Sequence, residues 1–408
     1  MIFTCTIIVV VVINSFAPLY VHSNFNIHSF LSGSKSGNGK KPFRNVLTVF
    51  QFTISIALLA SVLTLYKQIS FAKHSALGFN KELLLRLNLP LRFNNQEALK
   101  QNLNQLTFCQ MVSLSRGVPG FINMWMGSNP GEKSFMLQCF YVDIDFLKTM
   151  EIRLKEGRDF LPGDMGKTCI MNEAAFDQYG WDNIVNRKFD NQQDGSFIVV
   201  GITENFHVES LHSKIQPLCL IFVDKNMIKE FSNVSIRLTA GNIGNKMKEI
   251  EKQWKSFIPD EPIDYSFYED NFDAMYKQDK RLGTAIGMFA LIAFILTCMG
   301  ILGQIFQVCI NRTKEIGIRK INGATVSEMM AMLSKELVKW VALSFVIATP
   351  IAWYAMHKWL QGFAYKTELS WWIFALAGFL ALGIALLTVS WQSWRAASRN
   401  PVEALRYE

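Results

Sequence analysis

Long apolar runs alternate with polar, basic segments along the 408 residues of this chain. The runs cover residues 2–20, 46–66, 283–310, 333–357 and 371–391. A helix needs about 20 residues to cross a hydrocarbon core of about 30 Å. Each run is therefore predicted to form a transmembrane helix, about five in all, which places the chain among α-helical multi-span membrane proteins.

The segment before the second run is predicted to hold one more transmembrane helix and a linker. Residues 1–22 have no charge ahead of the apolar run and continue into bulky residues, which favours a true transmembrane helix over a cleaved signal peptide. Residues 23–45 mix four Lys and Arg with Gly and Ser, as expected of a basic cytoplasmic linker. The linker is no P-loop, because Gly33 to Gly39 is one residue too long and Lys41 replaces the required Ser or Thr.

Residues 67–282, which follow the transmembrane helix at 46–66, are polar and mixed, and are predicted to form a large α+β extracytoplasmic domain. Strand–helix–strand patterns occur at 83–116 and again at 234–268. Two such units on either side of a middle section predict one α+β subdomain that is split by an insertion.

Residues 283–408 are predicted to form three transmembrane helices, with a cytoplasmic hairpin at 311–330 and a cytoplasmic tail at 393–408. Both short segments are rich in Lys and Arg, which stay on the cytoplasmic side of a membrane. Pro350 is expected to kink the helix that contains it. Small residues let helices approach closely in lipid, either within one subunit or between two subunits; the candidates are Gly287, Gly300 and Gly303.

Composition agrees with a membrane protein. Half of the residues are hydrophobic, only 18% are charged, and the net charge is +8. Because the excess of positive charge lies in the short segments between apolar runs, it is explained without a nucleic-acid partner.

Few residues suggest chemistry. His207 and His212, with nearby carboxylates, lack the spacing of a zinc site, so a structural role is favoured. Asp143 and Asp145 are better explained by a short helix that Asp145 caps than by a pair of catalytic carboxylates. No nucleotide-binding or hydrolytic motif is visible. We therefore predict no catalytic, cofactor-binding or metal-binding residues, and no enzyme activity in this chain.

Seven cysteines occur, without any CxxC pair. Four of them lie in the predicted extracytoplasmic domain, where either buried thiols or disulfides are possible, and buried thiols are favoured. These four are Cys109, Cys139, Cys169 and Cys219.

The sequence EIGIRKINGA at 315–324 resembles the conserved cytoplasmic segment of the FtsX/MacB-type ABC transporter permease family. Residues 199–217 resemble the periplasmic core domain of that family, and residues 395–408 resemble its ending. The resemblance implies a MacB-like periplasmic core domain in the inner membrane protein of an ABC transporter. It also implies a separate ABC ATPase subunit, whose ATP-driven movement reaches the external domain for export or mechanotransmission.

In that family the cytoplasmic segment docks on the ATPase. The corresponding residues here are Arg312, Lys314, Glu315, Ile316, Gly317, Ile318, Arg319, Lys320 and Gly323. Other expected partners are membrane lipid and a second permease core, supplied either by a homodimer or by a missing N-terminal half.

Two alternatives to a transporter subunit stay open. Relatives of about twice this length carry two cores, so the chain looks like a C-terminal half and is possibly an inactive fragment of a longer permease. A membrane receptor or regulator that senses a ligand or activates a cell-wall hydrolase has the same architecture. Dependence on an ATPase separates the transporter from a stand-alone receptor.

Overall fold

The structure is a computed structural model that describes residues 41–90, 93–121, 124–128, 135–184, 187–191, 195–311, 318–319, 323, 325 and 326–397. The predicted transmembrane helix at 1–22, most of the predicted linker and the end of the tail lie outside these residues. The chain divides into two compact units, each described by itself below. The first unit contains residues up to Ser55, with Ala293–Ile347 and Ala381–Glu408, and the second contains Ile56–Ile292 with Ala348–Leu380.

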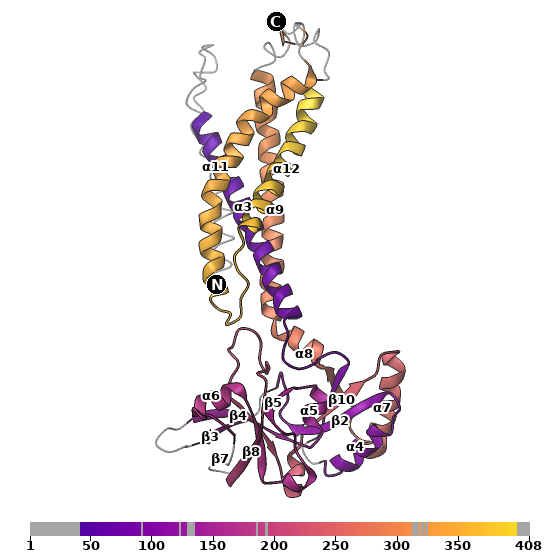
Figure 1. Ribbon diagram of the computed structural model, residues 1–408. Helices are drawn as coiled ribbons and strands as arrows, with labels where there is room; N and C mark the ends of the chain where they lie inside the picture. Colours follow the sequence, from indigo (N-terminus) through magenta and orange to yellow (C-terminus); the bar gives the residue numbers. More distant parts are fainter. Residues whose placement is uncertain are drawn as a thin grey trace. The chain divides into compact units, whose positions relative to one another are not determined.

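Four helices among the described residues are long and apolar enough to cross a membrane. They are α3 (Lys41–His74), α9 (Lys277–Asn311), α11 (Val326–Leu360) and α12 (Trp371–Ala397) (Figure 1). They match the last four predicted transmembrane helices.

The first of these helices is longer than predicted at both ends. It begins at Lys41, inside the predicted linker, because Pro42 is tolerated in the first turn of a helix. It continues past residue 66 to His74 because no Gly or Pro interrupts the sequence before Gly78. The candidate membrane span within this helix, Asn45–His74, begins next to the predicted start at 46 and extends past the predicted end at 66.

Polar side chains join the helices inside the first unit. The hydroxyl groups of Ser55 in α3 and Thr297 in α9 lie 3.2 Å apart. Ser344 Oγ in α11 donates to the carbonyl oxygen of Val49 at 3.0 Å. Hydroxyl contacts of this kind stabilise the association of helices where water is excluded.

The glycines predicted to pack helices differ in their surroundings. A Cβ at Gly300 would lie 3.0 Å from Gln51 Oε1, so this glycine does provide a close approach to α3. A Cβ at Gly287 would meet Val62 at 4.0 Å, and around Gly303 no described atom lies within 4 Å. Helix α11 continues through Pro350. The packing roles of these glycines and the kink at Pro350 stay predictions.

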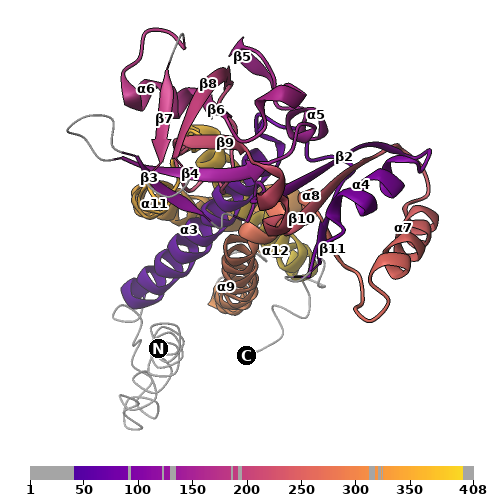
Figure 2. The same ribbon diagram turned by 90° about the horizontal axis from the view of Figure 1, so that it is seen from below.

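A sheet of four antiparallel strands forms one half of the α+β domain. Its order is β11 (Asp264–Phe267), β1 (Leu84–Asn88), β10 (Asn233–Leu238) and β2 (Cys109–Arg116). Helices α4 (Gln96–Asn104) and α7 (Ile243–Phe257) lie side by side on one face of it (Figures 1 and 2). These elements are the two predicted strand–helix–strand units, so the split α+β subdomain is confirmed.

The insertion forms the other half of the domain. Its strands pair in the order β4, β3, β7, β8, β6 and β9, and β9 pairs with β4 again, which closes the strands into a ring. The strands are β3 (Trp125–Ser128), β4 (Phe135–Val142), β6 (Thr168–Asn172), β7 (Lys188–Asn191), β8 (Gly195–Thr203) and β9 (Leu218–Phe222), with β5 (Leu154–Gly157) beside β8. The short helices of the domain are α5 (Phe146–Met150), α6 (Glu173–Tyr179), α8 (Tyr268–Met275), η1 (Pro162–Asp164) and η2 (Lys225–Glu230).

The predicted capping role of Asp145 is wrong. Asp145 stands at the N-cap of α5, but its side chain accepts no hydrogen bond from that helix. Its carboxylate and that of Asp143 both bind the ammonium group of Lys100, at 2.6 and 2.7 Å. Lys100 is buried, and a buried charge is tolerated only when it is paired, so the ion pair takes precedence over the cap.

Candidate functional site

The polar cluster that we call the junction joins the long helices to the α+β domain within the second unit. It contains the end of α3, helix α8 with the start of α9, the connection 361–370 between α11 and α12, and residues 204–212 of the domain. These segments are far apart in the sequence and meet through the contacts described below.

The chain enters and leaves the α+β domain at the junction. A turn at Gly78 follows α3 and passes so close to the domain that a Cβ there would lie 2.6 Å from the carbonyl oxygen of Asn205. Gly78 also has a φ of +80°, which favours glycine. At the exit, β11 runs into α8, and only Tyr276 separates α8 from α9. Both connections between the long helices and the domain are therefore short.

Asp273 in α8 holds the two connections together. Its carboxylate accepts from Lys73 Nζ in α3 at 2.5 Å and from Lys280 Nζ in α9 at 2.9 Å. Burial by itself raises the pKa of the Asp273 carboxyl, but the hydrogen bonds from the two lysines outweigh it and hold the pKa below its usual range. The carboxylate is thus charged at neutral pH and links the entry helix to the exit helix.

His212 connects the domain with the segment between α11 and α12. Its carbonyl oxygen accepts from Ala364 N at 3.2 Å. Its ring stacks on Phe363, with ring centroids 3.9 Å apart, and its Nε2 lies 3.5 Å from the Asp279 carboxylate. Leu211 adds a second backbone bond, from Tyr365 N to its carbonyl oxygen at 3.1 Å. The position fits the structural role predicted for His212.

Gln68 in α3 also binds the segment between α11 and α12. Its side chain is fully buried, donates to the carbonyl oxygen of Tyr365 at 3.0 Å and accepts from Thr367 N at 2.8 Å. Lys67 Nζ donates to the carbonyl oxygen of Glu368 at 3.1 Å. A single glutamine therefore satisfies two backbone groups of a connection that has no regular structure of its own.

Apolar contacts fill the space between these polar groups. Ala72, Leu211, Tyr276 and Phe363 form a buried cluster. Within it the Tyr276 hydroxyl oxygen accepts from Leu211 N at 2.8 Å. His207 packs with its ring edge-on to Tyr365, centroids 4.8 Å apart. Burial lowers the pKa of His207, so its neutral form is favoured.

The polar groups of the junction bind one another and the backbone. Among the described residues no group of three or more His, Cys, Asp or Glu side chains is arranged to hold a metal ion. The histidines and carboxylates of the junction are engaged with one another or with backbone and aromatic groups. Their bonds connect α3, α9 and the α11–α12 segment to one domain.

The predicted ATPase-docking residues lie mostly outside the described residues. Arg312, Lys314, Glu315, Ile316, Gly317 and Lys320 belong to that group. Ile318 is 56% exposed, Arg319 is exposed, and Gly323 has a φ of +85°, as expected for a turn. Their role in docking stays a prediction.

Sequence reasoning missed most of the junction. Gln68 and Asp273 were not singled out, because each stands among ordinary polar residues at the end of an apolar run or in a short helix. A polar residue directly after an apolar run was the available signal for Gln68. Tyr365 lies 297 positions from Gln68, and Lys73 lies 200 positions from Asp273, and local patterns do not reveal such pairings.

The four long helices and the α+β domain define a multi-span membrane protein, and its C-terminal part matches a known family. Residues 287–401 match the family described as FtsX-like permease C-terminal. The matched residues include most of α9 together with α11 and α12.

Individual proteins are similar to parts of the chain. The chain is 24% identical over 205 residues to the uncharacterized ABC transporter permease YknZ of Bacillus subtilis (strain 168), an alignment that covers 46% of this chain and 49% of YknZ. The match thus takes in about half the length of that relative. Solved structures similar to the chain include the periplasmic region of MacB from Actinobacillus actinomycetemcomitans, with 12% identity and a TM-score of 0.38. The match covers 49% of this chain and 95% of that chain. Another is the extracellular domain of YknZ, with 15% identity, 43% and 93% covered, and a TM-score of 0.33.

Proposed function

We propose that this chain is the permease subunit of an ABC transporter, in which ATP hydrolysis by a separate ATPase subunit moves the domain formed by residues 75–276. In this proposal the domain lies outside the cytoplasmic membrane, and its movement drives export or transmits a mechanical signal. The ATPase docks on the cytoplasmic hairpin 311–330.

The observation that carries the proposal is the junction. Asp273 bridges α3 and α9, while Gln68 and His212 bind the α11–α12 connection from two sides. A subunit that only anchored a receptor domain in the membrane would need a single attachment. Bonds to three separate parts of the transmembrane region support a domain that responds to the relative movement of helices.

The exposure of Ile318 and Arg319 supports docking at the hairpin. An apolar side chain that is 56% exposed next to an exposed arginine is available to a protein partner. We infer that Arg319 and Lys320 form ion pairs with the ATPase and that Ile318 supplies an apolar contact. Such interfacial charges determine the partner and the rate of association.

The experiment is co-purification of the tagged chain in detergent from its native host, with partners identified by mass spectrometry. We expect an ABC ATPase to be recovered with the parent chain. With Arg319→Glu/Lys320→Glu the amount of ATPase recovered should fall by about tenfold or more, because a charge reversal adds repulsion to the lost attraction. Stimulation of ATP hydrolysis by the permease should fall in parallel.

The matched control reverses two exposed lysines of α7, Lys248→Glu and Lys252→Glu, which leaves the hairpin intact. This control should recover the ATPase as the parent does. Equal recovery with the Arg319/Lys320 variant would refute docking at the hairpin. A folded parent chain that recovers no ATPase would instead favour the receptor function.

A further inference from the structure

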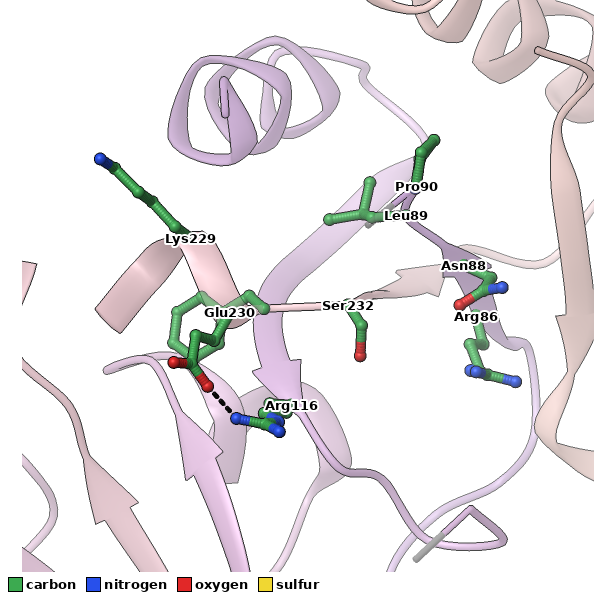
Figure 3. A pocket seen from close by; sticks show the side chains of 9 residues that line it. Arg86, Asn88, Leu89, Pro90, Arg116, Lys229, Glu230 and Ser232 are labelled. Carbon is green, nitrogen blue, oxygen red and sulfur yellow. Dashed lines mark hydrogen bonds and ion pairs between the residues drawn. The ribbon is translucent and has the colours of Figure 1, made fainter. Parts of the chain in front are cut away.

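A pocket of about 490 Å³ opens in the α+β domain where β1 and β2 end and β10 begins, away from the junction. Figure 3 shows the side chains around it. The residues that line it are Arg86, Asn88, Leu89, Pro90, Arg116, Lys229, Glu230, Phe231 and Ser232. This volume lies within the range of about 300–1,000 Å³ that is usual for small-molecule sites.

Arg86 is the half-buried cation of this pocket. Its Nε donates to Asn233 Oδ1 at 2.6 Å, and its guanidinium lies 3.8 Å from the centroid of the Phe121 ring. Among the described residues it makes no ion pair and no hydrogen bond through its two Nη atoms. Burial lowers the pKa of Arg86, while Tyr268 and Asp264 act weakly in the opposite direction. The guanidinium is therefore partly desolvated without an ion pair among the described residues.

Arg237, on the neighbouring strand β10, shows how this domain satisfies a buried arginine that is purely structural. Its three guanidinium nitrogens donate to the carbonyl oxygens of Thr149, Glu82 and Asn80 at 2.8, 3.1 and 2.7 Å. Glu151 adds an ion pair at 3.2 Å. Arg237 uses every nitrogen, whereas Arg86, which lines the pocket, forms a hydrogen bond through one. An uncompensated buried charge is costly, so this difference calls for a ligand.

The surroundings hold Arg86 in a fixed position. Asn233, which is fully buried, accepts from Arg86 Nε and donates through Nδ2 to Ser232 Oγ at 3.0 Å and to the carbonyl oxygen of Ser115 at 3.4 Å. Because Ser232 Oγ accepts from Asn233, its own proton is available to a ligand. In Figure 3 the Ser232 hydroxyl points into the open space between Arg86 and Arg116. The donors are thus preorganised around one location.

The charge and polarity of the lining indicate the kind of ligand. The lining contains three cations, Arg86, Arg116 and Lys229. Its single carboxylate, Glu230, is already paired with Arg116 (Figure 3). The remaining walls include the apolar side chains of Leu89, Pro90 and Phe231. A guanidinium fork matches the two oxygens of a carboxylate, and a hydroxyl can bind one of them as well. A phosphate carries more charge and more acceptor oxygens than these few donors satisfy.

We propose that this pocket binds the carboxylate of a small organic acid with a short apolar part, which Arg86 and Ser232 hold while Leu89 and Phe231 contact the apolar part. The site is separate from the ATPase-docking hairpin and from the junction, so it does not depend on the function proposed above. It gives the external domain a ligand of its own.

The test uses the full chain in detergent and isothermal titration calorimetry. The probe is N-acetyl-leucine, which has one carboxylate and one apolar side chain, and its uncharged analogue N-acetyl-leucinamide is the matched control ligand. We expect saturable binding of the acid and at least about tenfold weaker binding of the amide, since a hydrogen bond to a charged group contributes about 1.5–3 kcal/mol. Inorganic phosphate should bind no better than the amide.

Variants assign the binding to this pocket. Arg86→Gln should weaken the binding of N-acetyl-leucine by about tenfold or more. Arg153→Gln, at an exposed arginine outside the pocket, should leave this binding unchanged. Ser232→Ala removes only a hydroxyl and serves as the second variant if Arg86→Gln does not fold. It should weaken the binding of N-acetyl-leucine several-fold. Absence of saturable binding of the acid to the folded parent, equal binding of acid and amide, or unchanged binding in folded Arg86→Gln would overturn the proposal.

Discussion

The junction and the pocket at Arg86 are two polar regions that differ in whether their charged and polar side chains have partners. In the junction, Asp273 is paired with Lys73 and Lys280, and the side-chain amide of Gln68 is fully used. In the pocket, Arg86 keeps two nitrogens without an acceptor among the described residues.

This difference distinguishes polar groups that stabilise the fold from polar groups that are available to bind a ligand. A satisfied polar network holds elements together and gains nothing from a ligand, because each donor already has an acceptor. An unsatisfied cation in a cavity is costly in the empty domain and becomes favourable when an anion arrives. The two regions should therefore respond differently to mutation: changes in the junction should lower stability, and changes in the pocket should chiefly lower affinity for a ligand.

The largest loss of stability is expected from Gln68→Leu. The substitution removes the hydrogen bonds to the Tyr365 carbonyl oxygen and the Thr367 amide, and it leaves both backbone groups without these partners. We expect the free energy of unfolding to fall by about 2 kcal/mol or more. The measurement is thermal unfolding of the detergent-solubilised chain followed by tryptophan fluorescence.

Gln361→Leu is the matched control, since it makes the same substitution at an exposed glutamine in the segment that Gln68 binds. Its effect should stay within about 0.5 kcal/mol. Similar unfolding temperatures for the two variants would show that the bonds of Gln68 do not stabilise the junction.

A smaller loss is expected from Asp273→Asn, which leaves Lys73 and Lys280 without their carboxylate. Because all three side chains are partly exposed, the loss should be about 1 kcal/mol at pH 7. The pKa of Asp273 is lowered in the folded protein, so its contribution is present above about pH 4 and is lost as the pH falls through the lowered value.

The parent should accordingly lose stability on acidification below about pH 4 by more than Asp273→Asn does. Asp260→Asn, at an exposed aspartate with no ion pair among the described residues, is the control and should behave as the parent. An equal acid response in the parent and the Asp273 variant would contradict the assignment of the charge cluster.

The smallest effect is expected from His207→Gln. Burial lowers the pKa of His207 below its usual value of about 6.5, so protonation favours the unfolded chain. Stability due to the neutral ring is present above pH 6.5 and declines as the pH falls toward the lowered pKa. The variant cannot titrate, and its unfolding temperature should change less between pH 7 and pH 5, by an amount on the order of 1 °C. Identical pH profiles of the unfolding temperature in the parent and in His207→Gln would show that His207 does not contribute to the pH dependence of stability.

The sequence predicted the architecture well because membrane helices and amphipathic strands leave strong local patterns. The α+β fold was predicted at the level of its two strand–helix–strand units, whose alternating residues, such as Leu85 and Leu87 around Arg86, were visible in the sequence. The candidate sites were not predictable in the same way. Gln68 finds its partners near residue 366 and Arg86 finds Asn233, and these pairings exist only once the chain is folded.

The entry and exit of the α+β domain are adjacent, and this has an evolutionary consequence. The first and last strands, β1 and β11, pair with each other, with Leu85 opposite Phe267. A folded module whose two ends lie side by side can be replaced by another without moving the segments to which it is attached. The same set of long helices can therefore acquire a new α+β module through a single exchange of gene segments.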